Sequence, residues 1–181
     1  IMNKNNRTEN IEVQAEITAF TRLGWVFLPA LASLVFIATT DQVSHNIAPE
    51  PSLWITTLGI YLLTFILTFD HPRWYRPVPT VFFLLIVLCV AAGRDAIPNW
   101  LNFEWDYGVS ELRIMHYALL FFVCLLCHGE LYKRRPRDVR YLTEFYICMS
   151  LGGACGSIFV TLFATYLFND YYEWPMAILV T

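Results

Sequence analysis

The stretch CHGELYKRRPRDVRYLTEFY, residues 127–146, is a short basic turn between two long apolar segments. Those segments are too long and too poor in charge for the surface of a soluble protein. Lys and Arg residues next to a membrane span resist translocation, so a basic turn in this position is typical of the cytoplasmic side. The residues that we expect to determine the topology are Lys133, Arg134, Arg135, Arg137 and Arg140.

The composition also indicates a membrane protein. Of the 181 residues, 57% are apolar and 15% are charged, which is typical of an integral membrane protein and not of a soluble domain. The Arg-rich turn lies between expected spans and therefore predicts no nucleic-acid partner. All five cysteines lie in apolar segments, where a thiol acts as a small apolar group, so no disulfide framework is predicted.

The apolar runs predict an all-α integral membrane protein, a helical bundle of five transmembrane helices plus the start of a sixth. A polar segment, residues 1–21, precedes them, and its spaced apolar side chains allow a short interfacial helix. The last run reaches Thr181 before it is complete, which leaves a longer native chain open. Within the transmembrane domain, residues 22–181, the expected spans are about 23–40, 53–69, 78–92, 112–130, 144–168 and, incomplete, 174–181.

The positions of Lys and Arg predict the orientation of this bundle. With the amino terminus inside, ten of the twelve Lys and Arg residues fall on the cytoplasmic side. Only Arg94 and Arg113 fall on the opposite side. We therefore expect a multi-pass protein with a cytoplasmic amino terminus and with lipid contacts along its spans.

The sequence Cys124-Leu-Leu-Cys127-His128 matches the pattern of covalent c-type haem attachment. The basic turn that follows places this motif at the cytoplasmic end of its span, whereas covalent haem attachment occurs on the opposite side of a bacterial membrane. We therefore favour core cysteines over a haem site at Cys124, Cys127 and His128, and we expect no cofactor and no metal.

Ionisable side chains near the ends of the spans form an expected polar network of Asp41, His116, His128, Glu130 and Glu144. His116 and His128 share one span, but twelve residues separate them by about 18 Å along a helix, so they cannot bind the same ion. Glu130 and Glu144 bracket the basic turn. We expect them to form ion pairs with the turn that hold the helical hairpin, although ionisable groups at membrane depth are often functional.

The segment SLGGACGS, residues 150–157, lies in the longest apolar run. It has neither the G-x-G-x-x-G spacing nor a preceding strand, so it predicts no nucleotide site. Small residues four positions apart let a neighbouring helix approach closely. The expected helix-packing residues are Ser150, Gly152, Gly153, Gly156 and Ser157.

Several phrases occur in a fixed order along the chain: ATTDQVSHNIAPEPSLW (38–54), YLLTFILTFDHPRWYR (61–76), His116, CHGEL (127–131), LTEFYICMSLGGACGSIFV (142–160) and LFNDYYEWP (167–175). Together they resemble the membrane-embedded half of bacterial fused major-facilitator/spermidine-synthase-like proteins. The likeness covers about residues 22–181, and its most specific phrases are CHGEL and the segment from LTEFY to SLGG.

This resemblance implies a multi-pass protein of the bacterial inner membrane. In that family a cytoplasmic Rossmann-like domain, similar to aminopropyltransferases, follows the membrane half. The present sequence contains neither that domain nor the family's earlier spans, and it departs from the pattern at Glu50, Ser52 and residues 55–59. No residue matches a polyamine site, so the resemblance implies a topology and no mechanism.

From the sequence we favour a non-catalytic integral membrane subunit, an accessory or scaffold component of a larger bacterial membrane complex. Its expected partners are other transmembrane subunits and lipid. The observations behind this expectation are the glycine-rich fifth span, the incomplete sixth span and the lack of a catalytic constellation. Two alternatives stay open: the membrane half of a transporter or of a membrane-tethered spermidine-synthase-like aminopropyltransferase, and a haem-bearing electron-transfer subunit.

Overall fold

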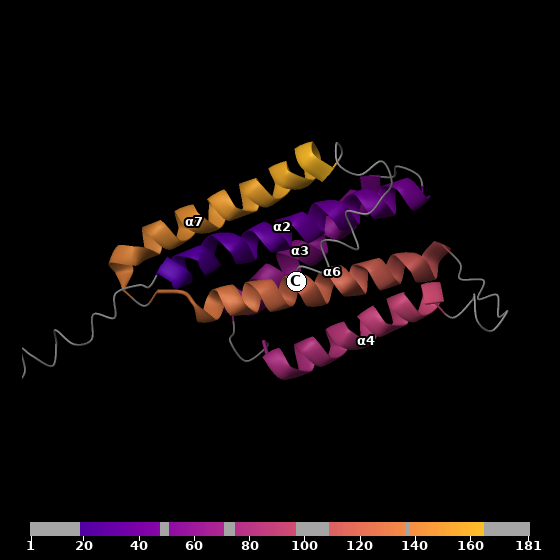
Figure 1. The fold of residues 1–181 in the computed structure, drawn as a ribbon, viewed down its shortest axis with the longest axis horizontal. Helices are drawn as coiled ribbons and strands as arrows, with labels where there is room; N and C mark the ends of the chain where they lie inside the picture. The colour runs from indigo at the N-terminus through magenta and orange to yellow at the C-terminus, as the bar shows by residue number, and fades with distance from the viewer. Residues whose placement is uncertain (1–18, 48–50, 71–74, 97–108, 137, 165–181) are drawn as a thin grey trace, which may run out of the picture.

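A computed structural model describes residues 19–47, 51–70, 75–96, 109–136 and 138–164, and all regular structure within these ranges is helical. The long helices lie side by side as one layered bundle (Figure 1). They are α2 (Ala19–Ile47), α3 (Pro51–Asp70), α4 (Pro77–Ala96), α6 (Val109–Lys133) and α7 (Val139–Ile158), which a π-helical segment η1 (Phe159–Ala164) continues. The all-α class predicted from the apolar runs is confirmed.

Four of these helices are long and apolar enough to cross a membrane, judged by length and composition. Their apolar segments are Ala19–Ser44, Pro51–Asp70, Glu111–Lys133 and Val139–Leu162. In α4 the apolar part, Pro77–Ala92, has fewer than 18 residues and falls short of the length of about 20 residues that a span needs. The sequence predicted the third of five spans there, at about residues 78–92, and within the described ranges the structure supports four spans in all.

Several expectations lie outside the described residues. These are the interfacial helix before residue 19, the sixth span at 174–181 and the side chain of Arg137.

The central helix of the bundle is α2, which packs against α7, α6 and α3. It extends beyond the predicted span, residues 23–40, at both ends. Proline inside a helix removes a backbone donor and usually bends or breaks the helix, yet α2 continues through Pro29. Neighbours on several sides stabilise this continuous course.

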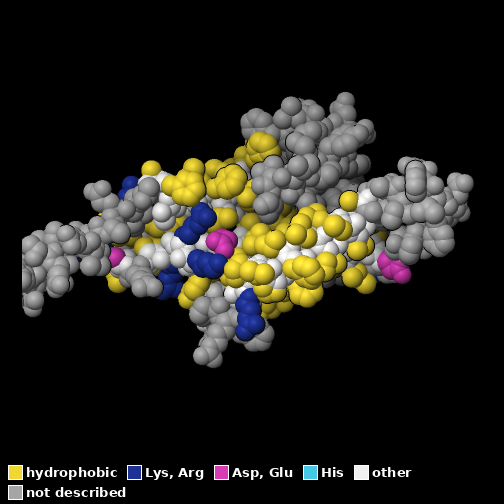
Figure 2. Space-filling view, turned by 60° about the horizontal axis from the view of Figure 1, so that its bottom comes forward, with side chains coloured by type: hydrophobic (Ala, Val, Ile, Leu, Met, Phe, Trp, Pro, Cys, Tyr) yellow, Lys and Arg dark blue, Asp and Glu magenta, His cyan; other side chains and the backbone are white. Residues whose placement is uncertain are grey.

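The buried core has two parts. The larger lies around α6 and includes Leu120, Val123 and Cys124, with Val35 of α2 and Leu84 of α4. A smaller cluster of Trp25, Leu131 and Phe145 lies nearer the basic turn and joins α2, α6 and α7. Apolar side chains also cover the outer faces of the helices, and basic side chains gather toward one end (Figure 2).

Candidate functional site

The contact between α2 and α7 is made by backbone against backbone. Gly152 and Gly156 are buried and face α2 at Val26 and Ala30. A Cβ atom on Gly152 would lie 2.9 Å from the Val26 carbonyl carbon, and one on Gly156 would lie 2.9 Å from that of Ala30. These two glycines therefore pack against a helix of the same chain. Their close contact with α2 is no evidence for a partner protein.

The end of α6 is fixed to α2 by the basic turn. The indole Nε1 of Trp25 donates a hydrogen bond to the Arg134 carbonyl oxygen at 2.9 Å. That carbonyl follows the last residue of α6 and has no partner within the helix, so the indole satisfies it. The Trp25 ring meets Phe145 of α7 edge-on, with centroids 5.4 Å apart. One buried residue thus joins three helices.

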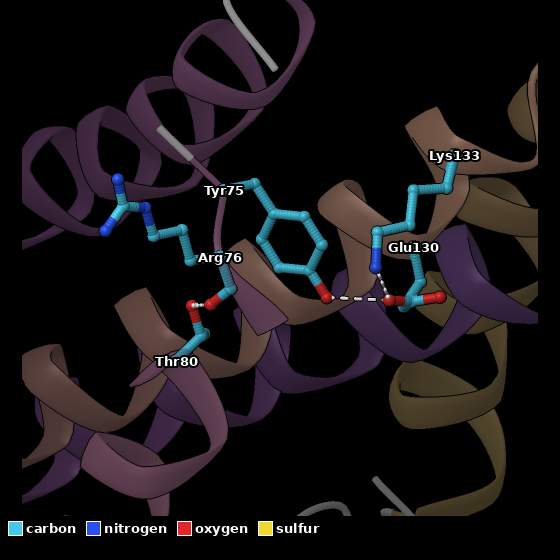
Figure 3. Close-up of polar contacts among 5 residues, drawn as sticks. All are labelled: Tyr75, Arg76, Thr80, Glu130 and Lys133. Atoms are coloured by element: carbon cyan, nitrogen blue, oxygen red, sulfur yellow. Dashed lines mark hydrogen bonds and ion pairs between the residues drawn. The ribbon is translucent and has the colours of Figure 1, made fainter. Parts of the chain in front are cut away.

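A polar contact holds the start of α4 to α6 (Figure 3). The Tyr75 hydroxyl donates to Glu130 Oε1 at 2.9 Å, and Lys133 Nζ donates to the same oxygen at 2.9 Å. Burial and the hydrogen bond to Glu130 raise the pKa of Tyr75 well above its ordinary value, so the hydroxyl keeps its proton. The Tyr75 ring lies directly on Gly129, where a Cβ atom would collide with it.

The two glutamates that bracket the basic turn have different partners. Glu130 pairs with Lys133 three residues along the same helix. Glu144 of α7 pairs with Arg22 Nε of α2 at 2.9 Å, outside the turn. The structure therefore places these glutamates in two separate contacts that hold helices together.

The other members of the predicted network lie elsewhere. Asp41 is exposed within α2, which continues to Ile47, so it is not at a helix end. His116 is buried in α6, with Nδ1 2.7 Å from the Leu112 carbonyl oxygen.

The cysteines of the haem-like motif are in the core. Cys124 is fully buried and Cys127 is 2% exposed. The Cys124 sulfur lies 3.9 Å from the Ala32 carbonyl oxygen of α2. Both thiols therefore lie among the buried side chains of the larger core cluster.

His128 is 1% exposed, and its Nδ1 lies 3.1 Å from Thr64 Oγ1 of α3. The Thr64 hydroxyl donates its single proton to the Tyr61 carbonyl oxygen at 2.7 Å. We therefore assign the proton between Thr64 and His128 to Nδ1, which leaves Nε2 as the hydrogen-bond acceptor of a neutral imidazole. The rings of Tyr61 and Phe65 meet the imidazole edge-on, with centroids 5.0 and 5.3 Å away.

The imidazole lines a groove of about 370 Å³ between α3 and α7, with α2 and α6 behind it. We call it the His128 groove. Its polar side chains are Ser33, Tyr61, His128, Ser150 and Ser157, and Gly153 lies among them. Three of the small residues predicted to pack helices, Ser150, Gly153 and Ser157, thus line a groove.

Sequence reasoning missed Tyr61, Thr64 and Tyr75. A signal for the polar face of α3 was present, because Thr57, Thr64 and Thr68 recur at intervals of seven and four residues, as one face of a helix requires. All three are fully buried. No comparable pattern marks Tyr75, whose partner lies 55 positions away in the sequence.

In the described part of the chain no group of three or more His, Cys, Asp or Glu side chains could hold a metal ion. Comparison with models of protein families, with curated proteins and with solved structures finds no match for this chain.

Proposed function

We propose that this protein is a non-catalytic integral membrane subunit that packs against other transmembrane helices in a larger assembly, through the outer face of α4. The main support is the position of α4 at the edge of the bundle, where its principal contact is α6 (Figure 1).

The outer face of α4 is apolar. Its exposed side chains, between 38% and 79% accessible, are Val78, Val81, Phe82, Leu85, Ile86 and Val90. The apolar part of the helix is nevertheless short for a bilayer. A short apolar helix is accommodated by thinning of the bilayer or by association with other helices. Association would cover this face without deforming the lipid, which favours a protein partner.

The glutamates near the basic end are used for structure. Glu130 binds Tyr75 and Lys133, and Glu144 binds Arg22. Each contact ties one helix to another or stabilises a helix end. This use of the carboxylates fits a scaffold better than an enzyme.

The test is purification of the chain from its native membrane in mild detergent. We expect a stoichiometric membrane-protein partner, and Phe82→Gln on the outer face of α4 should lower its recovery several-fold. Ile66→Gln is the matched control, because Ile66 is 60% exposed on α3 and Phe82 is 61% exposed on α4. A wild-type chain that purifies as a stable solitary monomer would contradict the proposal.

The proposed location is the bacterial inner membrane, with the amino terminus and the basic turn on the cytoplasmic side. Support comes from Arg22, Arg76 and Lys133, which lie at the same end of the bundle as the turn because α2 and α4 begin there and α6 ends there. Lys and Arg are retained on the cytoplasmic side of a span.

Neutral replacements at the basic turn test this orientation. Changing Lys133, Arg134, Arg135, Arg137 and Arg140 together should scramble the insertion of the following helix. A reporter fused at Thr181 that keeps its original side of the membrane would contradict the assignment.

A further inference from the structure

We propose that the His128 groove is a binding site for a neutral, membrane-soluble molecule whose head group carries hydroxyl or N–H donors. The inference rests on the proposed membrane location and is independent of the proposed partner at α4. The groove volume of about 370 Å³ lies within the range of about 300–1,000 Å³ that is usual for small-molecule sites.

The groove opens on the outer side of the bundle. Its rim includes Leu62 of α3, together with Ser150 and Ala154 of α7, and all three are exposed. These positions lie within the apolar segments of α3 and α7 that are long enough to cross a membrane. A ligand would therefore enter sideways from the lipid, between α3 and α7.

Two of the four hydroxyl protons on the groove wall are already used within the protein. Ser150 donates to the Tyr146 carbonyl oxygen at 2.9 Å, and Ser157 donates to the Gly153 carbonyl oxygen at 3.0 Å. A serine hydroxyl has one proton and two lone pairs, so each of these side chains is left with acceptor capacity. His128 Nε2 is an acceptor for the reason given above.

The remaining polar side chains of the wall are Tyr61 and Ser33. Each of these two hydroxyl groups has one proton, so together they offer at most two donors, against three acceptors at Ser150, Ser157 and His128. The wall thus presents more acceptors than donors. A complementary ligand supplies the donors.

The charge of the lining selects against anions. None of the residues that line the groove is Lys or Arg. An anionic head group would have no cation to pair with in apolar surroundings, where an unpaired charge is very costly. A neutral head group avoids that cost.

A bare hydrocarbon chain also fits the groove less well than a neutral polar head group, because it cannot donate a hydrogen bond. It would cover His128 Nε2 without giving it a hydrogen bond, and a buried acceptor left unpaired costs about 1–3 kcal/mol. Hydroxyl groups on an apolar tail satisfy both the nitrogen and the apolar wall formed by Phe65 and Met149.

Three probes with the same acyl chain separate these cases: monooleoylglycerol, methyl oleate and oleate at pH 8. The full chain in nanodiscs, labelled with ¹⁵N-histidine, is titrated with each probe. We expect monooleoylglycerol to bind at least tenfold more tightly than the other two and to shift the His128 Nε2 resonance. Equal binding of monooleoylglycerol and methyl oleate, or no shift of that resonance, would overturn the proposal and leave a groove filled only by lipid tails.

Two pairs of variants complete the test. Ala154→Phe should block the groove and weaken monooleoylglycerol binding at least tenfold, whereas Cys155→Phe, at the next exposed position of α7, should not. His128→Phe should abolish the preference for monooleoylglycerol over methyl oleate, whereas His116→Phe should keep it. If the buried substitution His128→Phe fails to fold, the variant at the exposed Ala154 still tests the site. Unchanged binding in Ala154→Phe would contradict the site, whatever the outcome at α4.

Discussion

The contact between α2 and α7 differs from the contact between α4 and α6 in what fills it. Between α2 and α7, Gly152 and Gly156 bring two backbones together. Between α4 and α6, the Tyr75 ring covers Gly129, and Phe83 stacks on Phe122 with centroids 5.8 Å apart. Helices in a bilayer associate through close packing and hydrogen bonds, because lipid tails are as apolar as their side chains.

This difference indicates how each contact responds to change. A backbone cannot move away from a new atom without shifting its helix, whereas a side chain such as Tyr75 can rotate. We therefore expect substitutions between α2 and α7 to affect the whole bundle, and those between α4 and α6 to act locally.

The largest effect is expected from Gly152→Ala combined with Gly156→Ala. Each new Cβ atom collides with an α2 carbonyl group, so α7 must move away. Overpacking costs about 1–3 kcal/mol at each site, which gives about 2–6 kcal/mol in the free energy of unfolding. Titration with SDS in micelles, followed by circular dichroism, measures it.

Gly59→Ala on α3 is the matched control for that pair. A Cβ atom there would meet nothing within 4 Å. The change should leave stability unaltered or raise it by about 0.5–1 kcal/mol, because alanine favours a helix more than glycine does. Equal losses at Gly59 and at the α7 glycines would show that packing against α2 is not the cause.

Gly129→Ala should have a smaller and local effect. The new Cβ atom occupies the place of the Tyr75 ring, which must swing away and release the start of α4 at a cost of about 1–3 kcal/mol. Hydrogen exchange should become faster in the first turns of α4 and stay unchanged in α2 and α7. Faster exchange throughout the bundle would remove the distinction between the two contacts.

The helical class and the approximate positions of four spans could be predicted, because runs of apolar residues report directly on burial or lipid contact. The partner of the α7 glycines could not be predicted. Small residues four positions apart indicate a close approach, but the pattern does not identify the helix that approaches. The structure identifies α2, which lies more than 100 positions away in the sequence.

The groove was harder still to predict from the sequence. Its polar lining comes from α2, α3, α6 and α7, and the pairing of His128 with Thr64 joins residues 64 positions apart. The sequence predicted that Cys124 and Cys127 on the same helix are core groups, and both are buried, but that prediction does not reach the groove. Tertiary packing alone brings His128 to the wall of the groove.

Tyr75→Phe should separate the ring from the hydroxyl in the contact between α4 and α6. The ring still covers Gly129, and only the hydrogen bond to Glu130 is lost, at a cost of about 1 kcal/mol. The effect stays small because Lys133 still neutralises the carboxylate. A loss in the free energy of unfolding as large as that of Gly129→Ala would show that the hydroxyl hydrogen bond, and not ring packing, holds α4 to α6.

The smallest effect is expected at the ion pair between Arg22 of α2 and Glu144 of α7. Their side chains are 50% and 38% exposed, and exposed pairs contribute less than about 1 kcal/mol. A double-mutant cycle of Arg22→Gln and Glu144→Gln measures the coupling, which should fall further at high salt, since exposed charges are screened. A coupling well above that range, insensitive to salt, would mean that lipid head groups exclude water from the pair. The α2 and α7 contact would then depend on charge as well as on glycine packing.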